Sequence, residues 1–407
     1  MKTYIIITPF FPTPNQFYGV YIYDQVKALQ RCGKNVLVLR PYNYIKDTVP
    51  ADYEIDGIKV YHFPTIQMPS YILNGLTDFI DVLLFKRFIK HINSKYSDVE
   101  AIHCHTLNCA TYGIEFKKQY PNAVSIIQHH DLDPYTIRNG RFANCKWNLY
   151  YKAHKAIKKF SKFDVHVSVS NRVEENLCTF PGISHREHFN EYINLLNKLG
   201  TKVKSPVIKK SIVVYNGIDF SKFRPIPEIK KDNSIYKIGC IGNYVNIKNH
   251  RLLIEATNIL VQKGYNNIRL SLVGNNPPGA FEDIKYFVME RNLQKYIEFL
   301  PPFAHSELSK FYNSLNLFVL PSEFEGLGCV YLESYACGTP FVGVKDQGID
   351  DLIPTEDKEK WLISKINAEE LANKIEQIMV NDYIQHISVD IDINHIIKDY
   401  LVSINLL

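Results

Sequence analysis

The chain has 407 residues, of which 46% are hydrophobic and 22% are charged. This length exceeds the size at which a single hydrophobic core keeps growing, so two globular domains are expected. The net charge is only +5, which does not indicate a nucleic-acid-binding protein.

The eight cysteines are scattered without a CxxC pair, and most lie in apolar stretches. Such thiols pack as small hydrophobic groups, which predicts a reducing, cytoplasmic location. The N-terminal stretch MKTYIIITPFFPTP has too few consecutive apolar residues for a signal peptide, and no run approaches the ~20 apolar residues of a membrane span. We expect a cytoplasmic protein that is soluble or peripheral on the inner face of the cell membrane.

The first elements form a strand, loop, helix and strand unit. Residues 4–7 are apolar as in a buried strand, and a Pro-rich loop leads to Gly19. A helix is predicted over 20–31, and a second strand begins at Asn35. This order predicts a parallel sheet with ligands at the carboxyl ends of its strands. Because Gly19 stands alone where GxGxxG would be needed, an NAD enzyme is the least favoured class.

Two stretches of this half combine basic and apolar residues. Residues 71–96 have apolar side chains at helical spacing and a basic second half. Residues 138–162 hold eight Lys or Arg and no acidic residue. A core-facing helix and a solvated helix face would explain them. The alternative is a surface that contacts anionic lipid headgroups or an acidic acceptor.

Two short predicted strands, 101–105 and 125–128, end in histidines. A metal site is not favoured, because neither pair brings a third ligand and a strand sends alternate residues to opposite faces. The histidines are His103, His105, His129 and His130.

Two Asp-x-Asp triplets have the form of a metal-binding motif. They are 131–133 and 390–392. Triplets of this kind are common by chance, so we assign no metal to either.

The second half alternates strands and helices. A strand at 164–170 and a helix after it close the first series, and strand 212–215 precedes the Pro- and Lys-rich segment 225–235. The later strands are predicted at 236–241, 269–273, 297–300, 317–320 and 341–344, and the helices at 251–263, 281–291, 306–312, 368–380 and 393–404. A second doubly wound sheet is therefore expected.

The stretch from Leu317 to Val342 contains the strongest signal for a ligand. Gly326 and Gly328 stand between a strand and a helix, where the backbone must come close to a partner. A helix N-terminus offers N–H groups and a positive dipole end, which suit a phosphate. Two carboxylates, Glu325 and Glu333, frame this loop with seven residues between them.

This pair of glutamates, within PSEFEGLG and YACGTPFV, resembles the E-x7-E signature of the GT4-like retaining glycosyltransferases, group 1 enzymes with the GT-B fold. The segment from Asn216 to Pro225 is also similar to the one that closes the N-terminal domain of that family. The resemblance implies an α/β protein of two Rossmann-like domains facing a cleft. The expected parts are an acceptor-side domain at 1–224, a linker at 225–235, a nucleotide-sugar domain at 236–390, and a C-terminal helix at 391–407 that crosses back to the first domain.

The resemblance also implies roles for individual residues. Lys248 would reach the donor phosphates, but Asn243 replaces an arginine that the family usually has there, which puts the phosphate contacts in doubt. Glu325 would contact the sugar ring and Glu333 the ribose hydroxyls. His130 would face the transferred sugar, with His129 as the alternative. The other donor-binding candidates are Gly19, Gly242, Gly274, Gly326, Leu327 and Gly328.

The implied activity is retaining transfer of a sugar from a nucleotide-sugar to a glycan or lipid-linked acceptor, in bacterial surface polysaccharide synthesis. No cofactor and no metal are expected. The alternatives are a silent sugar-nucleotide-binding subunit and a GT-B epimerase or phosphorylase.

Overall fold

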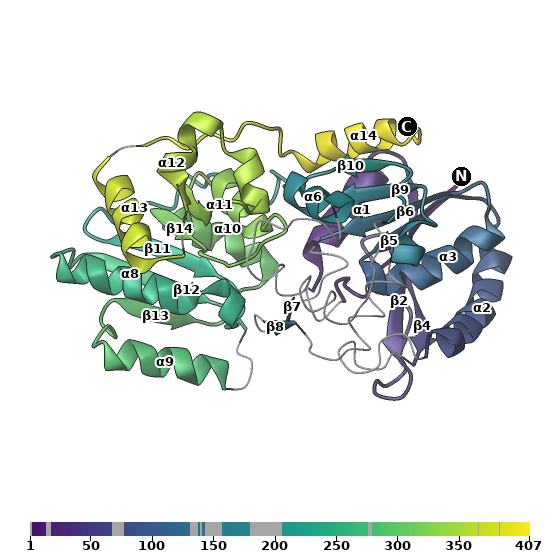
Figure 1. The fold of residues 1–407 in the computed structure, drawn as a ribbon, viewed down its shortest axis with the longest axis horizontal. Coiled ribbons are helices and arrows are strands. Elements are labelled where there is room, and N and C mark those ends of the chain that lie inside the picture. The colour runs from purple at the N-terminus through teal and green to yellow at the C-terminus, as the bar shows by residue number, and fades with distance from the viewer. Residues whose placement is uncertain are drawn as a thin grey trace. The chain divides into compact units, whose positions relative to one another are not determined.

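The computed structural model describes residues 2–13, 18–66, 77–130, 137–138, 141–142, 157–179, 206–275, 279–364, 366–381 and 383–407. The chain divides into two compact units (Figure 1). Unit 1 comprises Met1–Tyr215 and Ile393–Leu407, and unit 2 comprises Asn216–Asp392. The last helix therefore belongs to the unit that the N-terminus begins.

Unit 1 is built on an eight-stranded sheet in the order β10-β9-β6-β5-β1-β2-β4-β3, parallel except for the β3–β4 hairpin. Its strands are β1 (Thr3–Ile7), β2 (Asn35–Asn43), β3 (Tyr53–Ile55), β4 (Ile58–Thr65), β5 (Val99–His105), β6 (Val124–His129), β9 (Val165–Ser168) and β10 (Ser211–Val213). Its helices are α1 (Val20–Arg31), α2 (Asp78–Lys95), α3 (Ala110–Gln119), α5 (Ile157–Phe160), α6 (Asn171–Thr179) and α14 (Ile393–Ser403). A separate two-stranded ribbon joins β7 (Ile137–Arg138) and β8 (Arg141–Phe142).

Helices cover both faces of this sheet because successive strand residues point to opposite sides. Tyr4 and Ile6 of β1 pack in one core with residues of α1 and α14. Ile5 and Ile7 pack in another core with residues of α2 and α3. The central strand is thus apolar on both sides, as the run of hydrophobic residues predicts.

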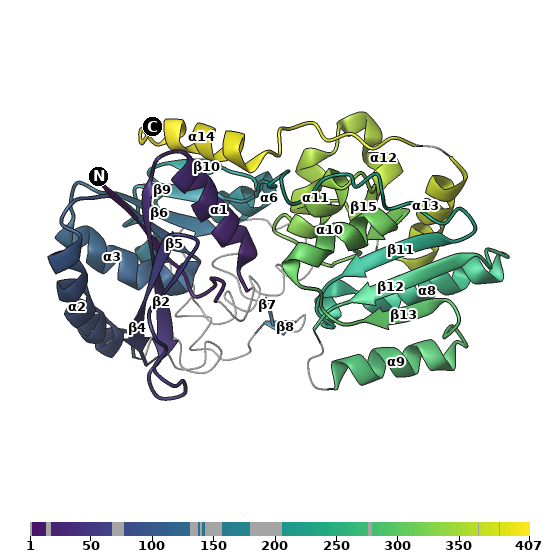
Figure 2. The same cartoon turned by 180° about the vertical axis from the view of Figure 1, so that it is seen from behind.

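Unit 2 is built on a six-stranded parallel sheet in the order β13-β12-β11-β14-β15-β16 (Figure 2). The strands are β11 (Tyr236–Ile241), β12 (Ile268–Val273), β13 (Ile297–Leu300), β14 (Leu317–Val319), β15 (Phe341–Val344) and β16 (Leu362–Ile363). The helices are α8 (His250–Gln262), α9 (Ala280–Glu290), α10 (His305–Ser314), α11 (Cys329–Ala336), α12 (Lys358–Trp361) and α13 (Ala368–Val380). In chain order this is the 3-2-1-4-5-6 arrangement of a Rossmann fold, whose strand order reverses between β11 and β14.

The predicted fold class, two Rossmann-like α/β domains, is confirmed. The apolar run at 58–62 predicts strand β4, whereas strand β3, helix α3 and several short elements, among them α5, α12 and β16, were not expected from the sequence. The Asp-x-Asp triplet at 131–133, the first part of the stretch 71–96 and most of the stretch 138–162 lie outside the described residues.

No helix among the described residues combines the length and the apolar character that crossing a membrane requires.

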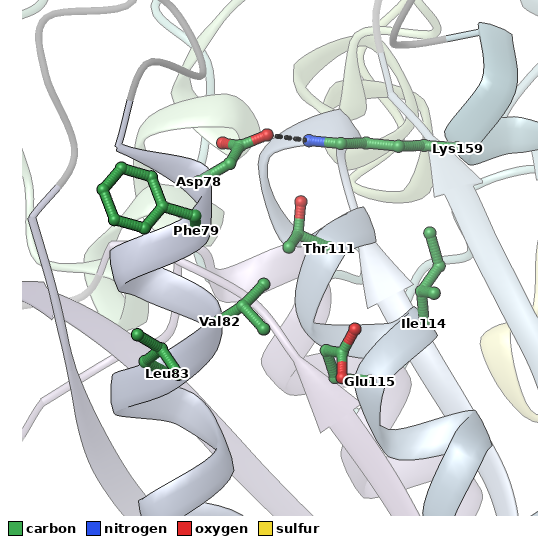
Figure 3. Close-up of a pocket in the computed structure, with 8 residues that line it drawn as sticks. All are labelled: Asp78, Phe79, Val82, Leu83, Thr111, Ile114, Glu115 and Lys159. Carbon is green, nitrogen blue, oxygen red and sulfur yellow. Dashed lines mark hydrogen bonds and ion pairs between the residues drawn. The ribbon is translucent and has the colours of Figure 1, made fainter.

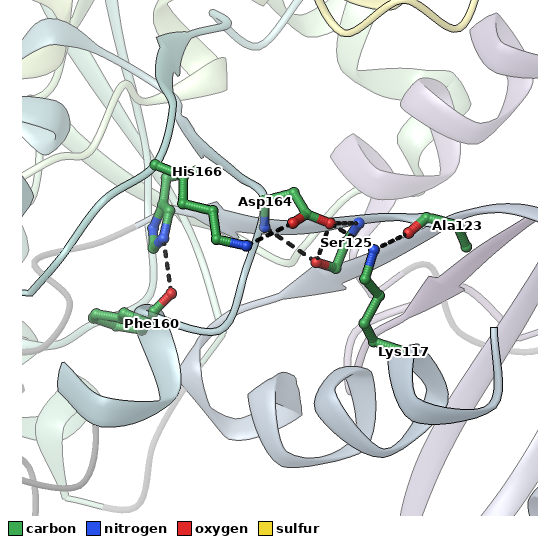
Figure 4. A network of polar contacts seen from close by, with 7 residues as sticks. Lys117, Ala123, Ser125, Phe160, Asp164 and His166 are labelled. Carbon is green, nitrogen blue, oxygen red and sulfur yellow. Dashed lines mark hydrogen bonds and ion pairs between the residues drawn. The ribbon is translucent and has the colours of Figure 1, made fainter. Parts of the chain in front are cut away.

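Hydrogen bonds to one carboxylate, that of Asp164, hold the amino-terminal ends of β6 and β9 together in unit 1 (Figure 4). The Asp164 carboxylate accepts hydrogen bonds from Lys117 Nζ at 2.8 Å, Lys209 Nζ at 2.9 Å, and the backbone N–H and hydroxyl of Ser125 at 3.0 and 2.8 Å. Although burial opposes ionisation, these donors hold the pKa of Asp164 well below its usual value. The network ties α3, β6, β9 and the approach to β10 together, at the edge away from the strand carboxyl ends.

Candidate active site

In unit 2, Lys248 and Glu325 meet where the strand order reverses. Lys248 ends a short 3-10 turn, Asn246–Lys248, that follows β11, and Glu325 lies in the loop that follows β14. The Lys248 ammonium forms an ion pair with Glu325 Oε1. Ligands of open parallel sheets bind at this crevice, outside the carboxyl ends of the strands. Two residues that are 77 positions apart are thus brought to one place.

Glu325 is held by more than its ion pair. Its Oε1 atom also accepts a hydrogen bond from the Ser322 hydroxyl at 2.6 Å. The backbone N–H of Glu325 donates to Gln347 Oε1 at 2.8 Å, and its carbonyl accepts from the Gly348 N–H at 3.2 Å. The Glu325 side chain is only 12% exposed, and these bonds fix both its backbone and its carboxylate.

Two glycine pairs let the loops of this edge come close together. A Cβ on Gly274, which follows β12, would lie 2.0 Å from the carbonyl oxygen of Gly242, which follows β11. A Cβ on Gly348 would lie 1.8 Å from the carbonyl oxygen of Gly326. Neither distance is compatible with a side chain, so these contacts require glycine whatever ligand is bound. Gly242 also lies beside Lys248, since its Cβ would be 3.4 Å from Lys248 Cγ.

Helix α11 begins at Cys329, directly after the loop that holds Gly326, Leu327 and Gly328. Gly328 has φ 78°, a left-handed conformation that glycine adopts without strain. The positive end of the helix dipole therefore adjoins the Lys248–Glu325 pair. Leu327 is buried, so it contributes backbone rather than side chain to the surface of the loop.

Glu333 lies in the second turn of α11, where Tyr312 of α10 orients it. The Tyr312 hydroxyl donates to Glu333 Oε2 at 2.7 Å. Tyr312 is fully buried, and burial, together with the nearby Glu333 carboxylate, raises the pKa of its phenol well above the usual value. The phenol is therefore a permanent donor that holds one carboxylate oxygen of Glu333.

Asn243 is exposed beside Gly242, and its Oδ1 accepts a hydrogen bond from Asn275 Nδ2 at 3.1 Å. A neutral amide thus occupies the position where an arginine was expected from the resemblance.

In unit 1, His130 and Gly19 lie at the carboxyl edge of the sheet. His130 directly follows β6 and is half-buried, with its ring 5.0 Å from that of Tyr21 in α1. Its Nε2 atom lies 2.8 Å from His105 Nδ1 at the end of β5. Gly19 precedes α1 with φ 81°, and a Cβ there would lie 2.6 Å from the backbone of Phe10. The fold alone thus requires glycine at position 19.

His129 points to the opposite side of the sheet. It is fully buried, its ring packs against Phe160, and its Nε2 lies 3.1 Å from His166 Nδ1. Because the Phe160 carbonyl accepts from His166 Nε2–H at 3.0 Å, a neutral His166 accepts at Nδ1 and His129 donates. Of the two histidines, His130 is the one that solvent can reach.

The described residues contain no group of three His, Cys, Asp or Glu side chains arranged to hold a metal ion. Sequence reasoning did not select Ser322, Tyr312, Gln347 and His105, which position the selected residues. Gln347 and Gly348 begin the stretch 347–351, whose partial similarity to the resembled family was the available signal for them.

Residues 235–381, which include this edge of unit 2, match the family model of the glycosyl transferases group 1. Unit 2 is a group 1 glycosyltransferase domain. The chain is also similar to curated glycosyltransferases. A 179-residue stretch is 28% identical to the capsular polysaccharide biosynthesis glycosyltransferase CapM of Staphylococcus aureus, covering 41% of this chain and 44% of that protein. A 166-residue stretch is 28% identical to the D-inositol 3-phosphate glycosyltransferase of Saccharomonospora viridis, covering 36% of this chain and 38% of that protein. The matches thus span less than half the length of these relatives.

Solved structures that resemble the whole chain show the GT-B fold. Anabaena HepE in complex with UDP and glucose aligns with a TM-score of 0.70 and 16% identity over 100% of both chains. Sucrose-phosphate synthase from Thermosynechococcus elongatus aligns with a TM-score of 0.68 and 17% identity, over 99% of this chain and 94% of that one. At these identities the likeness establishes the fold of the glycosyltransferase domain and of unit 1.

Proposed function

We propose that this chain transfers a sugar, with retention of configuration, from a nucleotide-sugar to a glycan or lipid-linked acceptor in surface polysaccharide synthesis. The observation that supports this most directly is the Lys248–Glu325 pair beside the N-terminus of α11. It lies at the strand-order reversal of a group 1 glycosyltransferase domain. Solved neighbours with UDP or UDP-glucose support a nucleotide-sugar as the donor.

In the proposed complex, the donor diphosphate replaces Glu325 as the partner of Lys248. A diphosphate carries more negative charge than one carboxylate, so it competes for the ammonium. Ser322 still holds the Glu325 carboxylate, which becomes an acceptor for a sugar hydroxyl. Glu333, oriented by Tyr312, accepts hydrogen bonds from the ribose hydroxyls. The backbone of residues 326–328 and the start of α11 face the phosphates.

The bond that breaks joins the anomeric carbon to the leaving phosphate oxygen. The bonding electrons go to that oxygen, where Lys248 and the α11 dipole stabilise the negative charge. The acceptor hydroxyl forms the new glycosidic bond on the same face of the sugar, and its proton goes to a phosphate oxygen of the leaving group. In unit 1, His130 orients the sugar. Neither glutamate acts as a nucleophile, unlike the paired carboxylates of glycoside hydrolases.

This proposal is tested first by a thermal-shift screen of UDP-, GDP- and ADP-sugars. One nucleotide class should raise the melting temperature, and the shift should grow with ligand concentration. The stabilising donor is then incubated with candidate glycans, and the anomeric proton of the product is followed by NMR. A product with the donor's configuration supports retaining transfer. Conversion of the donor without an acceptor into an epimer, or into a sugar phosphate when phosphate is added, would support the epimerase or phosphorylase instead.

Asn243 favours one alternative, a subunit that binds the donor without transferring its sugar. The neutral amide supplies one charge fewer than an arginine and none of its fork-like donors. Calorimetry that shows donor binding with no transfer to any glycan would support the silent subunit. The variant Asn243→Arg should then bind the diphosphate more tightly, since it restores the missing charge, while Asn275→Arg tests whether any added charge nearby does the same.

We also propose that unit 1 presents the acceptor side to an anionic membrane surface. The described parts of the two basic stretches lie side by side, because Lys159 Nζ pairs with Asp78 Oδ2 at 2.9 Å (Figure 3). They border a hollow of about 440 Å³ between α2 and α3, lined mainly by apolar groups. On α2, Phe79 and Leu83 are 66% and 59% exposed. Four cations, Lys86, Arg87, Lys90 and Lys118, are exposed on α2 and α3, and Lys86 and Lys118 share an ion pair with Glu115 of α3.

Exposed apolar side chains beside a basic flank suit the headgroup region of an anionic bilayer. Cosedimentation with vesicles of phosphatidylglycerol and phosphatidylcholine should exceed that with phosphatidylcholine alone and fall with added salt. The variant Phe79→Ser/Leu83→Ser should lose this binding. A control on unit 2, Tyr286→Ser, replaces an aromatic residue that is 63% exposed and should bind like the wild type. Equal binding by both variants would refute the assignment.

A further inference from the structure

A column of buried side chains stands behind His130 in unit 1. Tyr400 of α14 and Tyr4 of β1 share a hydrogen bond of 2.7 Å between their hydroxyls. The Tyr4 hydroxyl lies 2.9 Å from His103 Nδ1. The His103 and His105 rings are nearly parallel at 4.6 Å, because residues two apart in β5 share a face. The His105 ring is in turn nearly parallel to that of His130, and their nitrogens are 2.8 Å apart. The C-terminal helix is thus connected to the carboxyl edge of the sheet.

His105 is neutral in this setting. It has no exposed surface, and burial, together with His103 and His130, holds its pKa well below the usual value. The charged or titratable groups that face it in the column are His103, His130 and, beyond His103, the two tyrosines. A neutral imidazole carries one proton, on Nδ1 or on Nε2.

The surroundings of its two nitrogens decide where that proton sits. Nδ1 faces His130 Nε2, whereas Nε2 is buried and has no hydrogen-bond partner among the described residues. A proton on Nε2 would leave a buried N–H unsatisfied, and such orphan donors are rare in folded proteins. A proton on Nδ1 instead places the only donor of His105 in a hydrogen bond. His130 Nε2 then accepts, and the proton of a neutral His130 is on Nδ1.

We propose that His105 is a positioning residue, which donates from Nδ1 to His130 Nε2 and thereby fixes the ring orientation and the Nδ1–H tautomer of His130. Protonation of His130 would set two N–H groups against each other unless His105 moved its own proton to the unpartnered Nε2. When both rings are neutral, this contact leaves His130 as a hydrogen-bond donor from Nδ1. The idea that His130 Nδ1–H donates to a sugar oxygen rests on the proposed function, whereas the assignment of the His130 tautomer does not.

The tautomer can be measured directly. Protein labelled with nitrogen-15 in histidine is studied by long-range proton–nitrogen correlation at pH 7.5, and the His130 signals are identified by their loss in His130→Gln. The inference requires a protonated Nδ1 and an unprotonated Nε2 on His130. It also requires a protonated Nδ1 on His105, the nitrogen that faces His130 Nε2. A wild-type spectrum with His130 protonated on Nε2 would overturn it.

Two substitutions separate the hydrogen bond from packing. His105→Phe keeps a ring but removes the donor, so His130 should become a mixture of tautomers. His105→Asn keeps a donor near the position of Nδ1 and should retain the Nδ1–H form. Identical His130 signals in the wild type and His105→Phe would contradict the inference.

The kinetic consequence is tested with the donor that the thermal-shift screen selects. His105→Phe should lower kcat by about tenfold or more, as partners that orient metal-ligating histidines do, with a smaller effect on the donor KM. His105→Asn should recover most of the loss. Equal loss of kcat in both variants would refute a positioning role that acts through this hydrogen bond. If the wild type transfers no sugar, the proposed function fails while the tautomer measurement still decides the inference.

Discussion

Acidification should destabilise unit 1 far more than its surface charge would suggest. His103 and His166 are both fully buried, and burial lowers the pKa of each to about 3, with neighbouring histidines as the next cause. In the unfolded chain both have a pKa near 6.5. As the pH falls below 6.5, the unfolded chain binds protons that the folded unit does not, so stability is lost between pH 6.5 and about 3.

The size of the effect follows from these values. Between pH 7.5 and pH 5, each of the two histidines removes about 2 kcal/mol from the free energy of unfolding, or about 4 kcal/mol together. His105 acts in the same direction. Since domains are stable by only about 5–15 kcal/mol, this is a large fraction of the total.

The assay is urea unfolding followed by circular dichroism at pH 7.5, 6 and 5. Between pH 6 and pH 5, the free energy of unfolding of His166→Gln should fall by about 1.2 kcal/mol less than that of the wild type, because one titrating group is gone. His91→Gln is the matched control, since His91 is exposed on α2 of the same unit and should leave the slope unchanged. A wild-type loss below about 1 kcal/mol by pH 5, or equal slopes for both variants, would refute the reasoning.

Three further predictions concern single residues. Asp164→Asn should lower the free energy of unfolding at pH 7 by about 2–4 kcal/mol, because two lysines lose their shared carboxylate. The difference should shrink as the pH falls below about 4, where the unfolded chain binds the proton, and vanish only below the lowered pKa of the folded carboxylate; urea unfolding measures both. Tyr312→Phe should raise the donor KM by about tenfold with little change in kcat, because Glu333 loses its orienting donor; unchanged KM would argue against the ribose role. Gly348→Ala should lower the melting temperature and the activity together, since its Cβ would meet the Gly326 carbonyl, whereas Gly264→Ala has no such neighbour and tests only the left-handed φ of 100°.

Most of the strand and helix order of unit 2 could be predicted because the longer elements are bounded by Gly, Pro or polar residues, but the short α12 and β16 were not predicted. Helix α3 was not predicted because Gly113 interrupts its pattern. Its Cβ would lie 2.3 Å from Cys104 Sγ, so glycine serves the packing of the helix on β5. The hairpin turn Asp56-Gly57 between β3 and β4 did carry a recognisable signal, an Asp-Gly pair between short β-rich runs.

Some residues of the candidate site could likewise be predicted from the sequence, whereas others are brought there only by the fold. The selection of Glu325, Glu333 and Lys248 depended on local motifs, and the structure brings Lys248 and Glu325 together. The partners that hold them come from other strands and helices: Gln347 from the loop after β15 and Tyr312 from α10. Pairings of this kind depend on strand order and register, which no local pattern in the sequence encodes. The same is true of His105, whose contact with His130 follows from the β5–β6 register.

The most direct test of the central claim measures release of the nucleoside diphosphate from the selected nucleotide-sugar in the presence of its acceptor. Lys248→Ala and Glu325→Gln should each lower kcat/KM by about 100-fold or more, because the charge on the leaving group and the hold on the sugar are lost. Lys263→Ala is the control, since it breaks a comparable lysine–glutamate pair with Glu376 at the far end of α8 and should behave like the wild type. Near-full turnover by both Lys248→Ala and Glu325→Gln would contradict the account.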